Sequence, residues 1–119
     1  MPQPIPLETV HGRPAEPREV RFLLGLSRED FARLGGLTEK TVSDWEAGVP
    51  IERSLEARAE ELSRLLEALT HVMRTESAAG WLSRPNPAFD GLTPSEVIER
   101  GEYERIRRKI YQLESGIPT

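Results

Sequence analysis

The sequence contains no cysteine, and this absence excludes several kinds of chemistry at once. Disulfide bonds, thiolate nucleophiles and cysteine-based zinc sites all need the missing side chain. A chain without cysteine suits a reducing compartment, and we expect the protein to be cytoplasmic. The two histidines, His11 and His71, have no histidine or carboxylate set at metal-ligand spacing around them, so we expect no metal and no cofactor.

Long apolar runs and an excess of basic residues are absent as well. No apolar run approaches the roughly 18 residues of a membrane span, and the first residues, MPQPIPLETV, lack the charged-then-apolar order of a signal peptide. We therefore expect no contact with a membrane. The net charge of −4 disfavours a strong non-specific nucleic-acid binder, which needs a basic surface. With 37% apolar and 30% charged residues, the core must be small, and such chains often gain stability from a partner.

Sequence motifs of catalysis are also missing. The chain has no glycine-rich phosphate loop after a strand and no nucleophile-elbow pattern. Its many carboxylates fall on the solvated faces of expected helices. We therefore expect a binding protein and not an enzyme.

Helical periodicity runs through most of the chain, and no segment shows sustained period-two alternation. The sequence predicts an all-α fold without a sheet. Four segments follow from the composition: a flexible Pro-rich arm (1–14), a helix-turn-helix (15–50), a long amphipathic helix (51–79) and a C-terminal module (80–119). The arm could be a disordered tail, or it could clasp a second copy or reach DNA.

The long helix carries one apolar stripe with alternating spacings of four and three residues. The stripe consists of Leu55, Ala59, Leu62, Leu66, Leu69 and Met73. Two interpretations stay open, because such a stripe packs either into its own bundle or into a coiled-coil seam between two copies. One helix can serve both purposes, and we expect the protein to form a homodimer.

The segment LSREDFARLGGLTEKTVSDWEAG contains two short helices joined by a glycine turn. Ser27 and Thr38 have the hydroxyl side chains that cap helices, and Asp30 completes a capping box with Ser27. Nine residues of this segment form a pattern that is typical of a known motif: Ser27, Ala32, Gly36, Thr41, Val42, Ser43, Trp45, Glu46 and Gly48. It resembles the Cro/Xre-type helix-turn-helix, in which the second helix enters the major groove of DNA.

This resemblance implies a set of DNA-binding residues. Arg28 would lie at the phosphate-facing start of the first helix of the motif. The outward residues of the recognition helix would be Thr38, Glu39, Lys40, Thr41, Ser43 and Asp44.

The charge of this segment departs from the pattern of DNA-reading relatives. Between Ser27 and Gly48 there are three basic residues and five acidic ones. A carboxylate near a phosphate is repelled by roughly 1 kcal/mol at 4 Å even in water, although it can accept a hydrogen bond from cytosine. The segment is therefore either a DNA-binding element or a packing scaffold with weak or no DNA binding.

The last forty residues contain a series of turn and anchor residues. It runs Trp81-Leu82, Pro85-Asn86, Phe89, Gly91, Pro94, Glu96-Val97-Ile98 and Gly101-Glu102-Tyr103. The series resembles the C-terminal domain of the Xre/ParS/MbcA antitoxins, and with the upstream motif the likeness spans roughly Val20 to Ile117. It implies a Cro/Xre-like helical bundle, a long connecting helix and a small helical toxin-binding module. It also implies an antitoxin of a type II pair whose partner is a RES-domain toxin that consumes NAD or transfers ADP-ribose.

The side chains left outside this framework are the candidate toxin contacts. They are Arg84, Glu102, Arg105, Arg108, Lys109, Tyr111 and Gln112. The run from Arg105 to Lys109 is the densest cationic patch, although it could instead complement the helix dipole and pair with Glu102 and Glu104. By resemblance, a tail that covers or enters the NAD pocket of the toxin would consist of Glu114, Ser115, Gly116, Ile117, Pro118 and Thr119.

Two functions are consistent with these residues. The first is an antitoxin that neutralises a RES-domain toxin within a hetero-oligomeric complex and represses its own operon by binding operator DNA. The alternative is a stand-alone helix-turn-helix repressor.

Overall fold

A computed structural model of the chain describes residues 17–116, and the regular structure in this range is helical. The elements are α2 (Pro17–Leu23), α3 (Arg28–Gly35), α4 (Glu39–Glu46), α5 (Arg53–Val72), α6 (Thr75–Ser83), the 3₁₀ turn η1 (Pro87–Phe89), α7 (Pro94–Glu99) and α8 (Tyr103–Glu114). The described range contains no strand, which confirms the all-α prediction. The Pro-rich arm and the last three tail residues, Ile117, Pro118 and Thr119, lie outside the described residues.

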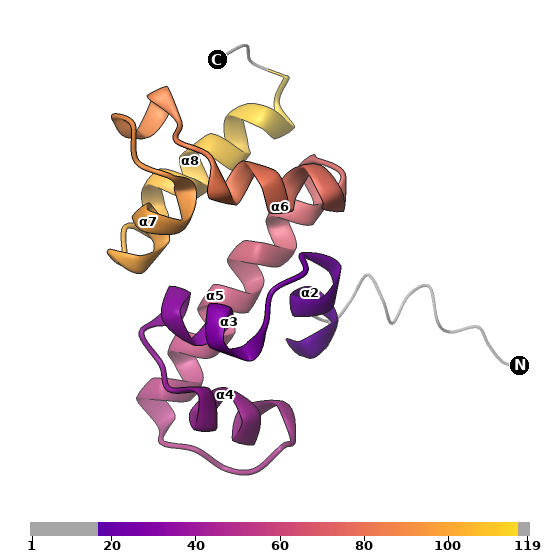
Figure 1. The fold of residues 1–119 in the computed structure, drawn as a ribbon, viewed down its shortest axis with the longest axis vertical. Coiled ribbons are helices and arrows are strands. Elements are labelled where there is room, and N and C mark those ends of the chain that lie inside the picture. The colour runs from indigo at the N-terminus through magenta and orange to yellow at the C-terminus, as the bar shows by residue number, and fades with distance from the viewer. Residues whose placement is uncertain (1–16, 117–119) are drawn as a thin grey trace, which may run out of the picture.

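Helix α5 is the axis around which the other helices are arranged (Figure 1). Helices α2, α3 and α4 pack against one part of it, and α6 and α8 pack against the other. Helix α7 contacts α3 as well as α6 and α8, so the two halves touch directly. The buried apolar residues of both halves form a single cluster.

Hydroxyl side chains cap the beginnings of α3, α4 and α7, as the sequence predicts for Ser27 and Thr38. The Ser27 hydroxyl accepts a hydrogen bond from the Asp30 N–H, and the Asp30 carboxylate accepts one from the Ser27 N–H, both at 3.0 Å. Thr93 and Glu96 make the same reciprocal pair at the start of α7. Each cap satisfies backbone donors that a helix start leaves free, so these helices begin at fixed residues.

The continuous helix expected over 51–79 is interrupted. Helix α5 ends at Val72, and α6 starts at Thr75 after two residues with extended backbone, Met73 (φ −153°, ψ 160°) and Arg74 (φ −64°, ψ 147°). No glycine or proline stands at this point. The bend lets α6 bury Ala78 and Leu82 against the C-terminal helices, and this tertiary packing overrides the local helical pattern.

Most of the apolar stripe of α5 is buried in the core of the chain itself. Ala59, Leu62 and Leu66 have no exposed surface, and Leu69 is 1% exposed. The structure therefore favours the intramolecular interpretation of the stripe over a coiled-coil seam. The homodimer remains a prediction.

Helix α2 buries Val20 and Leu24, whereas Leu23 is 54% exposed. Arg21 is buried as well, and its guanidinium group donates a hydrogen bond to Glu46 of α4.

Candidate functional site

The candidate DNA-binding surface is built on the packing of α3 against α4. The rings of Phe31 and Trp45 stack with their centroids 5.8 Å apart, and Val42 is fully buried beneath them. Ala32 is small and buried, so the two helices can approach closely. These contacts fix the angle between the helices, which is what a groove-reading motif requires.

The predicted recognition residues lie on one side of α4, but several already have partners. The Thr38 hydroxyl accepts a hydrogen bond from the Thr41 N–H at 3.0 Å and donates one to the Thr41 hydroxyl at 2.9 Å. The Lys40 ammonium pairs with the Asp44 carboxylate at 2.9 Å. Glu39 is exposed, while Ser43 is half-buried. Most of the predicted recognition side chains therefore already have hydrogen-bond or ion-pair partners within the chain.

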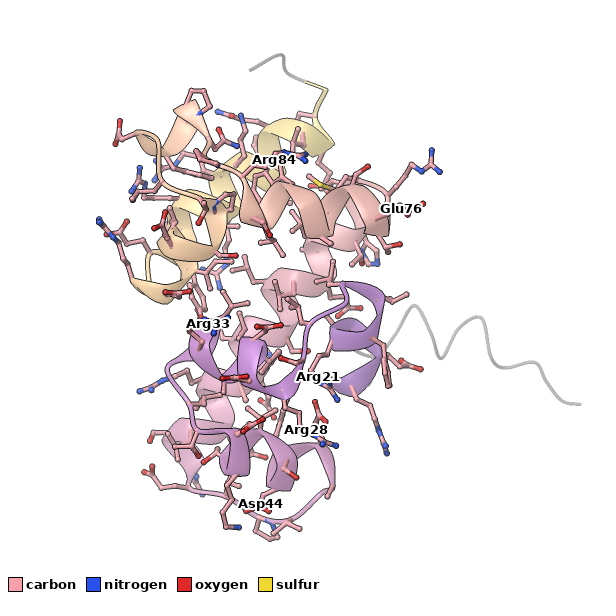
Figure 2. All side chains as sticks on the ribbon, viewed as in Figure 1. Arg21, Arg28, Arg33, Asp44, Glu76 and Arg84 are labelled. Atoms are coloured by element: carbon pink, nitrogen blue, oxygen red, sulfur yellow. The ribbon has the colours of Figure 1, made fainter. Side chains whose placement is uncertain are left out.

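Arg28, the expected phosphate contact, belongs to a three-residue ion cluster. Arg21 donates two hydrogen bonds to Glu46, at 2.7 and 3.0 Å, and Arg28 donates one at 3.2 Å. The Glu46 side chain is only 4% exposed, and Figure 2 shows Arg21 and Arg28 near each other between α2, α3 and α4. Burial would raise the pKa of Glu46, but the hydrogen bonds and charges of Arg21 and then Arg28 outweigh it and lower that pKa.

Arg21 is a site residue that the sequence did not predict. Its position between the apolar residues Val20 and Leu24 was the one signal in the sequence that it could lie near the core-facing side of the helix. A buried arginine in such a place requires an acidic partner, and Glu46 stands 25 residues away.

Every basic residue between Ser27 and Gly48 takes part in an ion pair. Besides Arg28 and Lys40, Arg33 pairs with Asp30 at 2.8 Å and with Glu99 of α7 at 3.7 Å. This face therefore presents cations that are already partly neutralised.

The candidate toxin-binding surface is centred on α8. The helix buries the apolar stripe Tyr103, Ile106 and Ile110, and a row of side chains lies on either side of it. Of these side chains, Lys109 is buried as well. The row beside η1 consists of Arg105, Arg108, Lys109 and Gln112. The row beside α5 consists of Arg107, Tyr111 and Glu114, next to Arg64, Leu65 and Ala68. The structure thus places the predicted contacts of α8 in two rows, with Arg84 and Glu102 in neither.

Ion pairs within and around α8 involve only some of its cations. Arg105 pairs with Glu102 at 2.8 Å and with Asp90 at 3.4 Å, and it lies over the ring of Phe89. Arg107 pairs with Glu61 of α5 at 2.9 Å and with Glu104 at 3.2 Å.

The Glu61 hydrogen bond raises the pKa of Arg107 most, followed by Glu104. The alternative of internal pairing is therefore correct for Arg105 and Arg107. Within residues 17–116, no ion pair involves Arg108 or Lys109.

Two of the predicted contacts differ in their surroundings from what the sequence suggested. Lys109 was expected outside, but it is 8% exposed, because the helix places it one turn from Arg105 and against η1. Arg84 ends α6 and lies over Gly80, and in the described part of the chain no hydrogen bond or ion pair joins it to α8. Ser115 and Gly116 are exposed at the end of α8. Figure 2 shows Arg84 at the opposite end of the molecule from Asp44.

The framework residues of the C-terminal module have the roles that their chemistry predicts. The Asn86 side chain accepts a hydrogen bond from the Ala88 N–H at 2.9 Å and fixes the turn into η1. Trp81 and Phe89 meet edge to face, with centroids 6.1 Å apart. Gly101 has a φ of +79°, which strains other residues, so it allows the reversal between α7 and α8.

Residues 17–116 contain no group of three or more side chains that could hold a metal ion. Among these same residues, no helix has the length and apolar character needed to cross a membrane.

Two ranges of the chain match known protein domains. Residues 65–116 match the antitoxin Xre/MbcA/ParS C-terminal toxin-binding domain, and residues 18–70 match a helix-turn-helix domain. Mycobacterial cidal antitoxin MbcA from Mycobacterium tuberculosis and from Mycobacterium bovis is 27% identical over 95 residues, which cover 79% of this chain and 84% of the relative. The fold is similar to a chain in the crystal structure of the M. tuberculosis MbcT–MbcA toxin-antitoxin complex, with a TM-score of 0.75 and 25% identity. That match covers 87% of this chain and 95% of the other.

Proposed function

We propose that the chain, whose residues 65–116 match the antitoxin Xre/MbcA/ParS C-terminal toxin-binding domain, is an antitoxin that neutralises a RES-domain toxin by covering the toxin's active site. The toxin would consume NAD or transfer ADP-ribose from it. The observation that carries the proposal is the match of residues 65–116 to a toxin-binding domain, in which α8 carries two rows of polar and aromatic side chains. The chain would act as a cytoplasmic binding protein without catalysis of its own.

The two rows of α8 are suited to different kinds of contact. The row beside α5 offers Tyr111, which is 65% exposed and large enough to anchor an interface. The row beside η1 offers cations. A toxin surface that spans both rows would hold α8 along its length and leave the residues after it free to approach the active site.

Co-expression tests the proposal directly. The tagged or untagged chain is co-expressed with a RES-fold protein encoded next to it. Cell growth and co-purification of the two proteins are measured. We expect a stable complex and relief of toxicity. Toxicity that persists, together with no co-purification, contradicts the proposal.

A truncation tests the role of the tail. Deleting residues 114–119 removes only the last residue of α8 and the tail beyond it, so we expect the helical circular-dichroism spectrum to persist while inhibition of NAD consumption falls. Full inhibition by the truncated protein would show that the tail does not cover the active site.

Autorepression is the second part of the proposal. The helix-turn-helix domain supports binding of a homodimer to paired half-sites in the operator of the toxin-antitoxin operon. Because its cations are internally paired, we expect binding to be weak for one copy and to depend on assembly. Salt-dependent operator binding that is weakened by Arg28→Ala or Lys40→Ala supports this role, and unchanged affinity in both variants rejects it.

A stand-alone repressor remains the alternative, favoured by the well-packed α3–α4 pair. The gene next to this one discriminates between the two functions. A neighbouring RES-fold gene supports the antitoxin, and operator binding without any toxin partner supports the repressor.

A further inference from the structure

Lys109 is a buried cation without a partner. Its exposed fraction is 8%, and within the described residues no hydrogen bond or ion pair involves its ammonium group. Lysine is almost never this buried unless it is paired, because removing its charge from water is costly. A site that keeps such a group is prepared for an anion that residues 17–116 do not supply.

The surroundings of Lys109 form a small hollow between α8 and η1. The hollow measures about 200 Å³ and is lined by Ala88, Phe89, Arg105, Arg108, Lys109 and Gln112. The four α8 residues stand at positions i, i+3, i+4 and i+7, which places them in one row along the helix. Apolar atoms of η1 form the opposite wall.

The hollow carries a surplus of positive charge. Arg105 is neutralised by Glu102 and Asp90, but Arg108 and Lys109 have no acidic partner within residues 17–116. The chain as a whole has a net charge of −4, so this local surplus is not a general property of its surface. An anion bound here would therefore be held by at least two uncompensated cations.

The size and donors of the hollow favour a carboxylate. Pockets for nucleotides and other small ligands usually enclose about 300–1,000 Å³, more than this hollow offers. The fork of an arginine and the ammonium of a lysine together match the two oxygens of a carboxylate, and the Gln112 amide adds a further donor. Binding would also exclude water at the Phe89 side, which strengthens the pairing.

We propose that the hollow between α8 and η1 receives an aspartate or glutamate side chain of the toxin, with Lys109 and Arg108 as the residues that bind its carboxylate. This inference rests on the proposed function, because it names the chemistry of one contact in the antitoxin–toxin complex. It assigns to Lys109 a role in specificity and affinity and none in the stability of the free chain.

The experiment compares three single variants of the full chain for binding to the toxin. Lys109→Met keeps the length of the side chain and removes its charge, and Arg108→Gln removes the charge of the exposed neighbour. Arg100→Gln is the matched control, because Arg100 is exposed at the end of α7 and makes no ion pair in the described range. Dissociation constants are measured by calorimetry at low and high salt, and thermal unfolding of each free variant is followed by circular dichroism.

We expect Lys109→Met to weaken toxin binding by about tenfold or more, since it deprives a buried toxin carboxylate of the more buried of its two cationic partners. The same variant should unfold at an unchanged or higher temperature, because a buried unpaired charge is gone. Arg108→Gln should weaken binding several-fold and reduce its salt dependence, and Arg100→Gln should leave the dissociation constant within about twofold.

Equal toxin affinity for wild type and Lys109→Met overturns the inference while the proposed function stands. A wild-type chain that binds no RES-fold toxin overturns both. If Lys109→Met does not fold, Arg108→Gln decides, because its exposed side chain is not needed for packing.

Inorganic phosphate serves as the probe for a free small anion. Lys109-dependent stabilisation of the free chain by phosphate, together with normal toxin binding by Lys109→Met, would show a small-anion site and refute the contact.

Discussion

The α3–α4 surface and the α8 surface both display basic residues, but they use them differently. On α3 and α4, Arg28, Arg33 and Lys40 all have acidic partners within the chain. On α8, Arg108 and Lys109 have none in the described residues. A basic residue in the sequence is therefore a poor guide to a binding site, and the state of its partners is a better one.

The difference has a physical consequence for each surface. Paired cations near α4 hold helices together and contribute little net attraction for phosphate. The cations of α8 that have no acidic partner within residues 17–116 are available to pair with an anion of another molecule. We infer that the first surface is built mainly for stability and the second mainly for association.

Replacing Glu46 by alanine should have the largest effect on this comparison. The change leaves Arg21, whose side chain is 10% exposed, without its partner, and we expect a loss of about 3 kcal/mol in the free energy of unfolding. Urea denaturation of the free chain measures it. The matched control is Asp44→Ala, which breaks a pair with a largely exposed lysine and should cost at most about 0.5 kcal/mol. Equal losses in the two variants would show that the Arg21–Glu46–Arg28 cluster is no more structural than a surface pair.

Replacing Tyr111 by alanine probes the other surface. Because the side chain is 65% exposed in the free chain, we expect the free energy of unfolding to change by less than about 0.5 kcal/mol, but toxin binding to weaken by about 1–2 kcal/mol. Val49→Ala is the control, since Val49 is 48% exposed beyond the end of α4. Toxin binding that is equally sensitive to both changes would contradict the assignment of α8 as the interface.

Local chemistry made most of the fold predictable from the sequence. The capping boxes at Ser27 and Thr93 and the turn at Asn86 rest on side chains that act on backbone groups a few residues away. The end of α5 at Val72 was not predictable in this way, because no breaker stands there and the bend is made by burial of Ala78 and Leu82.

The candidate sites were predictable only as sets of residues. The assignment of α8 to the candidate interface follows from the spacing of its apolar stripe, which leaves the other faces of the helix outside. The division into two rows depends on η1 and α5, which are distant in sequence. The pairing of Arg21 and Arg28 with Glu46 likewise joins residues 25 and 18 positions apart, and no local pattern encodes it.

Replacing Asp44 by asparagine should make the α4 surface more like that of α8. It frees the Lys40 ammonium and removes a negative charge from the recognition helix. We expect operator affinity to rise about two- to fivefold, because the charge–phosphate interaction is about 1 kcal/mol at close range in water. Fluorescence anisotropy at several salt concentrations measures it. Glu60→Gln, an equal change of charge on an exposed part of α5, controls for net charge. Weaker binding by Asp44→Asn would show that this carboxylate reads a base.

The smallest expected effect is on the pH dependence of stability. The pKa of Glu46 is lowered in the folded chain from its ordinary value of 4.5, so its contribution is complete above that pH and is lost as the pH falls through the folded value. The pKa of Asp30 is lowered in the same direction, chiefly because the Ser27 N–H bonds its carboxylate.

Acid should therefore weaken the free chain through carboxylates of the helix-turn-helix half. Below pH 4.5, the free energy of unfolding should depend less steeply on pH in Glu46→Gln than in the wild type. The difference in slope should be less than about 1.4 kcal/mol per pH unit, which is the value for one full proton. Urea unfolding followed by Trp45 fluorescence in a Trp81→Phe background measures this slope, because Trp45 stacks on Phe31 next to the cluster. An unchanged slope in Glu46→Gln would mean that acid acts elsewhere and that ion pairing near α4 does not set the pH response of the fold.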